Sequence, residues 1–211
     1  MQICLIKFET DENFRTRDVE KLRGYIANTF RDEIMVHNHI STFEFNYKMP
    51  KIQYKLIDKK LAIFGIEQGA EFIKNNCINV KEIDIEGKII KNFRTQIIID
   101  NKEFEVVDEL FSYKFITPWL ALNQNNYLKF KKGEFDLNKQ IQNNILSNFK
   151  DLGIKVNKKI IAKGDFKPIK IIMKDTELIG FKGDFVCNVK IPDYMGIGKR
   201  KSIGYGTVIS N

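Results

Sequence analysis

KIQYKLIDKKLAIFGIEQGAEFIKNN, residues 51–76, carries the pattern that best indicates the fold class of this chain. Its first part predicts two strands joined by a turn at Asp58 to Lys60, because apolar runs flank a short polar segment. Residues 67–76 then predict a short helix. A hairpin followed by a helix is the middle of a β-α-β-β-α-β unit.

The flanking residues complete this unit. QICLIKF (2–8) predicts a first strand. RDVEKLRGYIANTF (17–30) predicts a helix, since Val19, Leu22, Ile26 and Phe30 recur at helical spacing. INVKEIDIEGKIIKN (78–92) predicts a return to strand, with a tight turn at Glu86-Gly87. The order β-α-β-β-α-β is the ferredoxin-like arrangement.

The second half follows a similar order. Residues 105–122 predict strand, and LNKQIQNNILSNFKDLG (137–153) predicts a helix with Asp136 as N-cap and Gly153 as C-terminal stop. Residues 155–174, 177–192 and 205–210 predict strands, while a second helix is not visible in this half. We therefore expect an α+β fold of two tandem ferredoxin-like (βαββαβ, RRM-like) domains, spanning residues 1–100 and 101–211.

Composition favours a globular protein with an anionic partner. The 211 residues are 43% hydrophobic and 29% charged, and 35 Lys and Arg against 27 Asp and Glu leave a net charge of +8. Nucleic acid is the commonest partner for such a charge, and the alternative is a basic surface without an anionic partner. No apolar run near the start is long enough for a signal peptide or a membrane span, so we expect a soluble cytoplasmic protein without a membrane partner.

The three cysteines are too few and too widely spaced for a zinc site. Cys4, Cys77 and Cys187 include no CxxC pair. Their number and spacing indicate reduced thiols in a cytosol, and we expect them to be small buried hydrophobic residues.

The loop GIGKRKSIGYG, residues 196–206, has the composition of an anion-binding segment. It is not a Rossmann fingerprint, because Lys201 stands where the third glycine is needed, and not a P-loop, because Tyr205 follows Gly204. Glycines permit positive φ angles and close approach to another chain, and three consecutive cations suit a polyanion backbone. The candidate RNA-binding residues are Gly196, Gly198, Lys199, Arg200, Lys201, Gly204 and Gly206. The alternative is a flexible basic hairpin without a ligand.

His37 and His39 are the chain's two histidines. In an extended segment they face the same way, roughly 6.5–7 Å apart between Cα atoms, which suits two groups that flank one phosphate. Histidine can deprotonate a ribose 2′-hydroxyl and protonate a leaving 5′-oxygen, because its pKa lies near neutrality. Two alternatives stay open. The pair could be solvated or capping residues, or it could bind a metal, although no third Cys or His accompanies it.

These residues together resemble the CRISPR repeat-RNA endoribonucleases of the repeat-associated mysterious protein (RAMP) superfamily, in particular the short type I-B-like branch. The resemblance rests on the glycine-rich loop, on HNH (37–39), on residues 49–73 and on FSYKFITPWLALNQNNY (111–127). It implies two ferredoxin-like domains, with the loop of the second contacting repeat RNA. It also implies cleavage of precursor transcripts within each repeat without a metal or other cofactor, leaving 2′,3′-cyclic phosphate and 5′-hydroxyl ends.

The resemblance assigns roles to four residues. His37 and His39 fall where the family places its general acid and base, Tyr47 where this branch has a supporting hydroxyl, and Lys51 where a cation could neutralise the phosphorane. The more familiar family pattern has a single histidine in the first helix, so either histidine here could be acid or base. Tyr47 could equally be a packed aromatic residue and Lys51 a solvated cation.

The partners implied are CRISPR repeat RNA, other subunits of a type I effector complex and a second copy of the chain. We expect Trp119 and Tyr127 to be core or domain-interface residues rather than platforms for stacked bases. The rival function is a non-catalytic RNA-binding RAMP subunit of an effector complex. The histidine pair distinguishes the two, because a binding subunit does not need it.

Overall fold

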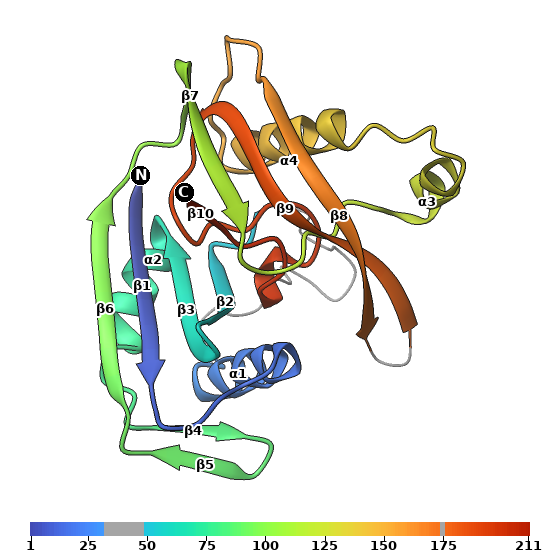
Figure 1. Ribbon diagram of the computed structural model, residues 1–211. Helices are drawn as coiled ribbons and strands as arrows, with labels where there is room; N and C mark the ends of the chain where they lie inside the picture. The colour runs from blue at the N-terminus through green and yellow to red at the C-terminus, as the bar shows by residue number, and fades with distance from the viewer. Residues whose placement is uncertain (32–48, 174–175) are drawn as a thin grey trace. The chain divides into compact units, whose positions relative to one another are not determined.

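The computed structural model describes residues 1–31, 49–173 and 176–211 (Figure 1). The chain forms two units, one of Met1–Lys102 with Ser202–Gly204 and one of Glu103–Lys201 with Tyr205–Asn211. His37, His39 and Tyr47 lie outside the described residues. None of the helices in the described ranges is long and apolar enough to cross a membrane.

The first unit contains a four-stranded antiparallel sheet with the order β2-β3-β1-β6. Its strands are β1 (Gln2–Glu9), β2 (Ile52–Ile57), β3 (Lys60–Ile66) and β6 (Arg94–Asn101). Helix α1 (Thr16–Thr29) connects β1 to β2, and α2 (Gln68–Asn76) follows β3. The connections and the strand order are those of a ferredoxin-like unit, as the sequence predicts.

Side-chain burial and turn geometry explain the predicted helix and strands of the first unit. Val19, Leu22 and Ile26 are the buried face of α1. The β2–β3 turn places Asp58 and Lys59 at φ angles of 50° and 63°, the two positive values that a tight hairpin turn requires. Strands β1 and β3 lie in the middle of the sheet, so their nearly continuous apolar runs are buried on both faces.

The fourth strand of this sheet is not the one predicted. Residues 78–92 do not join it: β4 (Glu82–Ile85) and β5 (Lys88–Lys91) form a separate two-stranded sheet around the predicted Glu86-Gly87 turn. The hairpin buries Ile83, Ile85 and Ile90 and packs against α1, where the Tyr25 hydroxyl donates to the carbonyl of Glu82 over 2.8 Å. Strand β6 pairs with β1 instead.

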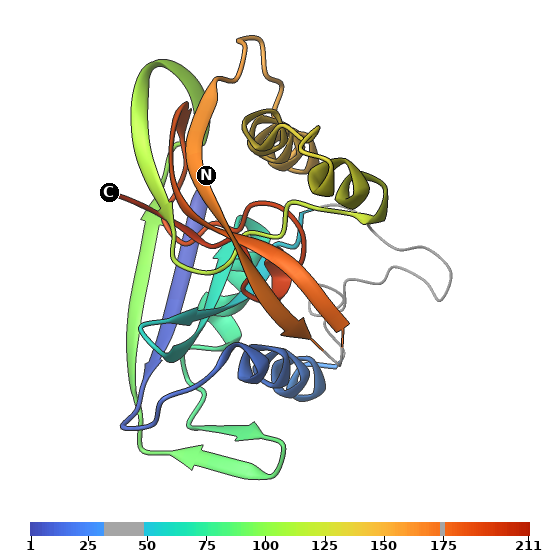
Figure 2. The same cartoon turned by 45° about the vertical axis from the view of Figure 1, so that its right-hand side comes forward.

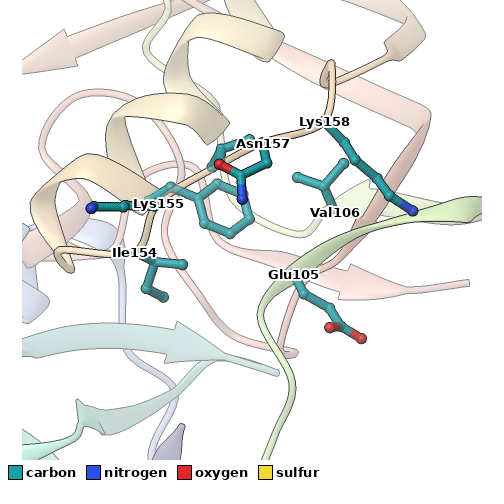
Figure 3. Close-up of a pocket in the computed structure, with 8 residues that line it drawn as sticks. Glu105, Val106, Ile154, Lys155, Asn157 and Lys158 are labelled. Atoms are coloured by element: carbon teal, nitrogen blue, oxygen red, sulfur yellow. The ribbon is translucent and has the colours of Figure 1, made fainter.

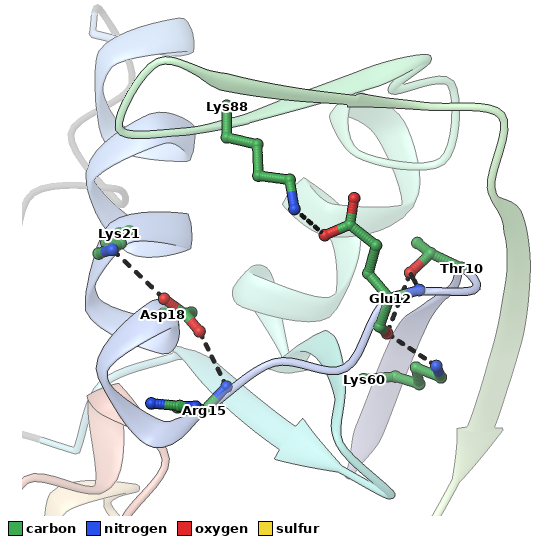
Figure 4. Close-up of polar contacts among 7 residues, drawn as sticks. All are labelled: Thr10, Glu12, Arg15, Asp18, Lys21, Lys60 and Lys88. Atoms are coloured by element: carbon green, nitrogen blue, oxygen red, sulfur yellow. Dashed lines mark hydrogen bonds and ion pairs between the residues drawn. The ribbon is translucent and has the colours of Figure 1, made fainter.

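Charged groups fix the β1–α1 loop to this hairpin (Figure 4). The Glu12 carboxylate pairs with Lys88 of β5, and the Lys60 ammonium donates to the Glu12 carbonyl over 2.7 Å. The Asp18 carboxylate accepts from the Arg15 backbone N–H at 2.8 Å, which satisfies one donor at the start of α1. The beginning of α1 is therefore tied to the hairpin and to β3.

The second unit repeats the strand order with one helix missing. Its antiparallel sheet runs β10-β7-β9-β8, and α3 and α4 lie between β7 and β8. These elements are β7 (Glu105–Phe115), α3 (Gln124–Lys131), α4 (Leu137–Asp151), β8 (Ala162–Met173), β9 (Thr176–Lys190) and β10 (Val208–Ser210). Between β9 and β10, where a second helix would stand, the chain has only a short 3-10 turn at Lys201–Ile203. The glycine-rich segment thus takes the place of that helix.

The core of the second unit is aromatic. Trp119 is fully buried and stacks on Phe115, with ring centroids 5.4 Å apart. Helix α4 packs against β8 (Figure 2), and its buried apolar residues are Ile141, Ile145 and Phe149. Its predicted termini are confirmed: the Asp136 carboxylate accepts from Lys139 N–H at 3.0 Å, and Gly153 has a φ of 72°. Helix α3, which the sequence did not predict, has no buried residue.

Candidate nucleic-acid interface

The glycine-rich loop is closed at its base by backbone hydrogen bonds. Gly196 and Thr207 form a bridge, and Ile197 N–H donates to the carbonyl of Gly206 over 2.8 Å. Gly206 N–H in turn donates to the carbonyl of Pro118 over 2.8 Å. The base of the loop is therefore held by hydrogen bonds within the second unit.

Two of its glycines are required by the protein's own packing. Gly198 has a φ of 87°, and a Cβ there would lie 2.6 Å from Nε1 of Trp119. Gly206 has a φ of 63°, and a Cβ there would lie 1.9 Å from the carbonyl oxygen of Ile197. Both positions combine a backbone conformation that side chains disfavour with a close internal contact. Packing within the chain therefore requires glycine at both positions.

Some backbone N–H groups of the loop donate hydrogen bonds within the chain. Lys199 N–H donates to the carbonyl of Leu120 at 3.1 Å, as Gly206 N–H does to Pro118. Gly204, with a φ of 89°, groups with the first unit, where a Cβ would lie 3.1 Å from the Tyr54 carbonyl oxygen. The N–H groups of Lys199 and Gly206 are therefore already used within the chain.

The three cations of the loop have different surroundings. The Lys201 ammonium donates to Oδ1 of Asn148 at 2.6 Å and pairs with Asp151 at 3.3 Å, and its side chain is only 12% exposed. Burial lowers the pKa of Lys201, and the Asp151 carboxylate opposes this effect. Lys199 and Arg200 are exposed, and no carboxylate of the described ranges pairs with either. Two free cations, not three, face solvent in this loop.

A cavity of about 650 Å³ lies beside these two cations. Its walls come from the chain before α3, from α3 itself and from the start of β9. Tyr127, which we expected in a core or a domain interface, is a half-buried residue of this wall, whereas Trp119 is in the core as expected. Helix α3, and with it the cavity, was not predicted from the sequence. The available signal was the N-cap Asn123, whose side chain accepts from Asn126 N–H at 2.8 Å.

A second, smaller cavity lies between the start of β7 and the segment after α4 (Figure 3). It has a volume of about 230 Å³ and is lined by Glu105, Val106, Phe149 and residues 154–158. Its charged groups are largely paired: Lys158 with Asp108 at 2.8 Å, and Glu105 with Lys190 at 3.3 Å. The cavity is smaller than the usual ligand site of roughly 300–1,000 Å³.

Lys51 is the one predicted catalytic residue within the described ranges. It immediately precedes β2, and its carbonyl accepts from Ile66 N–H at 2.8 Å. The same carbonyl lies against the first turn of α2, where a Cβ on Gly69 would approach it to 2.1 Å. The backbone of Lys51 is therefore fixed at the point where the undescribed segment 32–48 rejoins the first unit.

The cysteines are confirmed as buried free thiols. Burial raises the pKa of Cys4 and Cys187 to about 11 and that of Cys77 to about 12. At neutral pH all three are protonated and therefore poor nucleophiles. No group of three or more His, Cys, Asp or Glu side chains that could hold a metal ion occurs in residues 1–31, 49–173 and 176–211.

Models of known protein families match this chain along its whole length. The model of the Cas6b N-terminal domain matches residues 1–108, and that of the Cas6b C-terminal domain matches residues 105–211. The chain belongs to the Cas6b family. This confirms the resemblance inferred from the sequence.

Solved structures agree with this membership. A crystal structure of a Cas6b is 33% identical and has a TM-score of 0.91, with both chains covered completely. A second, described as the CRISPR RNA processing endoribonuclease Cas6b, is 30% identical with a TM-score of 0.73 and the same coverage. An uncharacterized protein of Methanocaldococcus jannaschii is 36% identical over 138 residues, which are 63% of this chain and 94% of that protein. A type IV Cas6 crRNA endonuclease, at 12% identity and a TM-score of 0.57, shares the fold.

Proposed function

We propose that this protein is the endoribonuclease that cuts CRISPR precursor transcripts within each repeat to release mature crRNA. The observation that carries the proposal is the match of the entire chain to both Cas6b domains, with a relative of known structure described as a CRISPR RNA processing endoribonuclease. The net charge of +8 is consistent with an RNA substrate.

The proposed chemistry is an internal transesterification that needs no metal. One of His37 and His39 removes the proton from the 2′-hydroxyl, whose oxygen attacks the adjacent phosphorus. The other protonates the 5′-oxygen as its bond to phosphorus breaks, so that a 2′,3′-cyclic phosphate and a 5′-hydroxyl result. Tyr47 supports this arrangement with its hydroxyl, and the Lys51 ammonium offsets the charge of the phosphorane.

RNA binding in this proposal uses the loop's exposed cations. Lys199 and Arg200 contact the RNA backbone, while Gly196, Gly198, Gly204, Gly206 and the paired Lys201 hold the loop in shape. The three free thiols fit a reducing compartment, so we place the reaction in the cytoplasm. Other type I effector subunits and a second copy of the chain are the protein partners we propose.

Incubation with the repeat RNA of the encoding genome, with and without EDTA, tests the proposal. We expect equal cleavage in both samples at one position within the repeat. His37→Ala and His39→Ala should each slow single-turnover cleavage by about 10²-fold or more without weakening RNA binding. RNA that is bound tightly but left intact would instead identify a non-catalytic RAMP subunit. Cleavage that EDTA abolishes would reject the metal-independent chemistry.

A further inference from the structure

The 650 Å³ cavity beside the loop lies entirely within the second unit and falls in the size range of ligand sites. Its wall is mostly apolar, and Leu128 of α3 remains 63% exposed there. The apolar and aromatic residues that line it are Leu120, Leu122, Tyr127, Leu128, Leu178 and Ile179. An exposed apolar surface of this kind is typical of a ligand-binding or interaction site.

The charges around the cavity favour an anion. Lys199 and Arg200 line one side of it, and burial lowers the pKa of Lys199. The single carboxylate of the wall, Glu177, is paired with Lys170 at 2.5 Å. On α3 the Lys131 ammonium lies 4.9 Å from the centre of the Tyr127 ring. Lys199 and Arg200 therefore stand beside the apolar residues of the wall, and no unpaired carboxylate of the wall opposes them.

The polar groups of the wall can form hydrogen bonds with the edge of a nucleobase. Gln124 is exposed, and its side-chain amide makes no hydrogen bond to the described residues. An amide offers both a donor and an acceptor. A nucleobase has an apolar face for stacking and a polar edge for hydrogen bonds, and its own backbone phosphate supplies the negative charge nearby.

We propose that this cavity receives one unstacked nucleobase of single-stranded RNA. Tyr127 and Leu128 contact its face, and Lys199 and Arg200 hold the neighbouring phosphate. A base inside a duplex is stacked and paired, so only a single-stranded nucleotide can enter. The proposal rests on the proposed function only for the identity of the RNA, because the site would select unpaired nucleotides whether or not the chain cuts.

Abasic scanning of the repeat RNA tests the proposal. The scissile nucleotide carries a 2′-deoxy substitution to prevent turnover, and each base in turn is removed while its phosphate is kept. Affinities are measured for the wild-type protein and for Tyr127→Ala, Tyr127→Phe and Leu128→Ala. Leu110→Ala is the matched control, because Leu110 is also 63% exposed but does not line the cavity.

We expect one abasic position to weaken wild-type binding by about 5- to 100-fold, the range of base–aromatic stacking. Tyr127→Ala should weaken binding of the intact RNA by a similar factor and be insensitive to that abasic position, since the two changes remove the same contact. Leu128→Ala should act in the same direction, whereas Tyr127→Phe and Leu110→Ala should bind as wild type does.

Two results would overturn the inference: abasic effects of equal size in wild type and Tyr127→Ala, or intact-RNA affinity unchanged by Tyr127→Ala. Thermal unfolding of each variant shows whether a loss of affinity reflects a loss of fold. The proposed function fails separately, when wild-type protein does not cut unmodified repeat RNA in parallel samples.

Discussion

Adjacent residues of the same type can have unrelated roles, as Lys199 and Lys201 show. In the sequence they belong to one run of three cations. In the folded chain Lys199 faces solvent, whereas the ammonium of Lys201 is bound by Asn148 and Asp151 of α4. The difference arises from side chains about 50 positions away, which no local pattern predicts. The charge run indicates a basic loop but not which cations are available to RNA.

This difference predicts two kinds of effect from lysine removal. Lys199→Ala combined with Arg200→Ala should lower RNA affinity and flatten the slope of log K against log salt by up to about 1.4, or about 0.7 for each phosphate. Lys201→Ala should leave the slope unchanged and lower the free energy of unfolding by about 1–3 kcal/mol, because it breaks hydrogen bonds of a largely buried charge. Salt titrations of binding and urea unfolding measure the two effects. If Lys201→Ala also flattened the slope of log K against log salt, the assignment of Lys201 to a structural role would be wrong.

Glycine at position 206 is fixed by internal geometry, which leads to a stability prediction. Gly206→Ala should lower the free energy of unfolding by more than about 2 kcal/mol, because a positive φ and a contact with the Ile197 carbonyl both oppose the new methyl group. Gly153→Ala is the control, since Gly153 has a φ of 72° with nothing within 4 Å. Gly153→Ala should lower the free energy of unfolding by only about 1 kcal/mol. Equal losses in urea unfolding would show that the loop is not closed as described.

At the scale of secondary structure, the helices and strands that were predicted are those whose buried residues form a clear apolar pattern in the sequence. Helix α1 buries one regular face and the strands of hairpin β2–β3 bury nearly continuous apolar runs, and both were predicted. Helix α3 buries no residue, so it has no apolar period, and β6 has three exposed isoleucines in succession at positions 97–99 instead of alternation. The hairpin β4–β5 has a regular pattern but buries it against α1. A pattern thus shows that a face is buried, not which partner covers it.

The packing of this hairpin on α1 is testable with two neighbouring isoleucines of β5. Ile90 is 4% exposed and Ile89 is 56% exposed. Ile90→Ala should lower the free energy of unfolding by about 2–5 kcal/mol, because Ile90 is buried opposite Ile83 of β4, the strand that packs on α1. Ile89→Ala should cost less than about 1 kcal/mol. Similar losses for both variants in urea unfolding would mean that the hairpin does not pack on α1.

At the scale of the whole molecule, two units of the same strand order have different connections. The first has a helix before its last strand, and the second has the glycine-rich segment there. The second connection presents Lys199 and Arg200, while the predicted catalytic histidines belong to the sequence of the first half. We infer that, in the proposed function, the first unit provides the catalytic residues and the second unit provides much of the RNA binding.

The central claim is that the chain cuts repeat RNA with the RNA's own 2′-hydroxyl as nucleophile. Its most direct test is a time course on two repeat RNAs that differ by one 2′-deoxy substitution at the scissile nucleotide. The unmodified RNA should be cut to a 2′,3′-cyclic phosphate and a 5′-hydroxyl, in EDTA as in buffer. The deoxy RNA should bind with unchanged affinity and stay intact. Cleavage of the deoxy RNA at the normal rate would contradict the account.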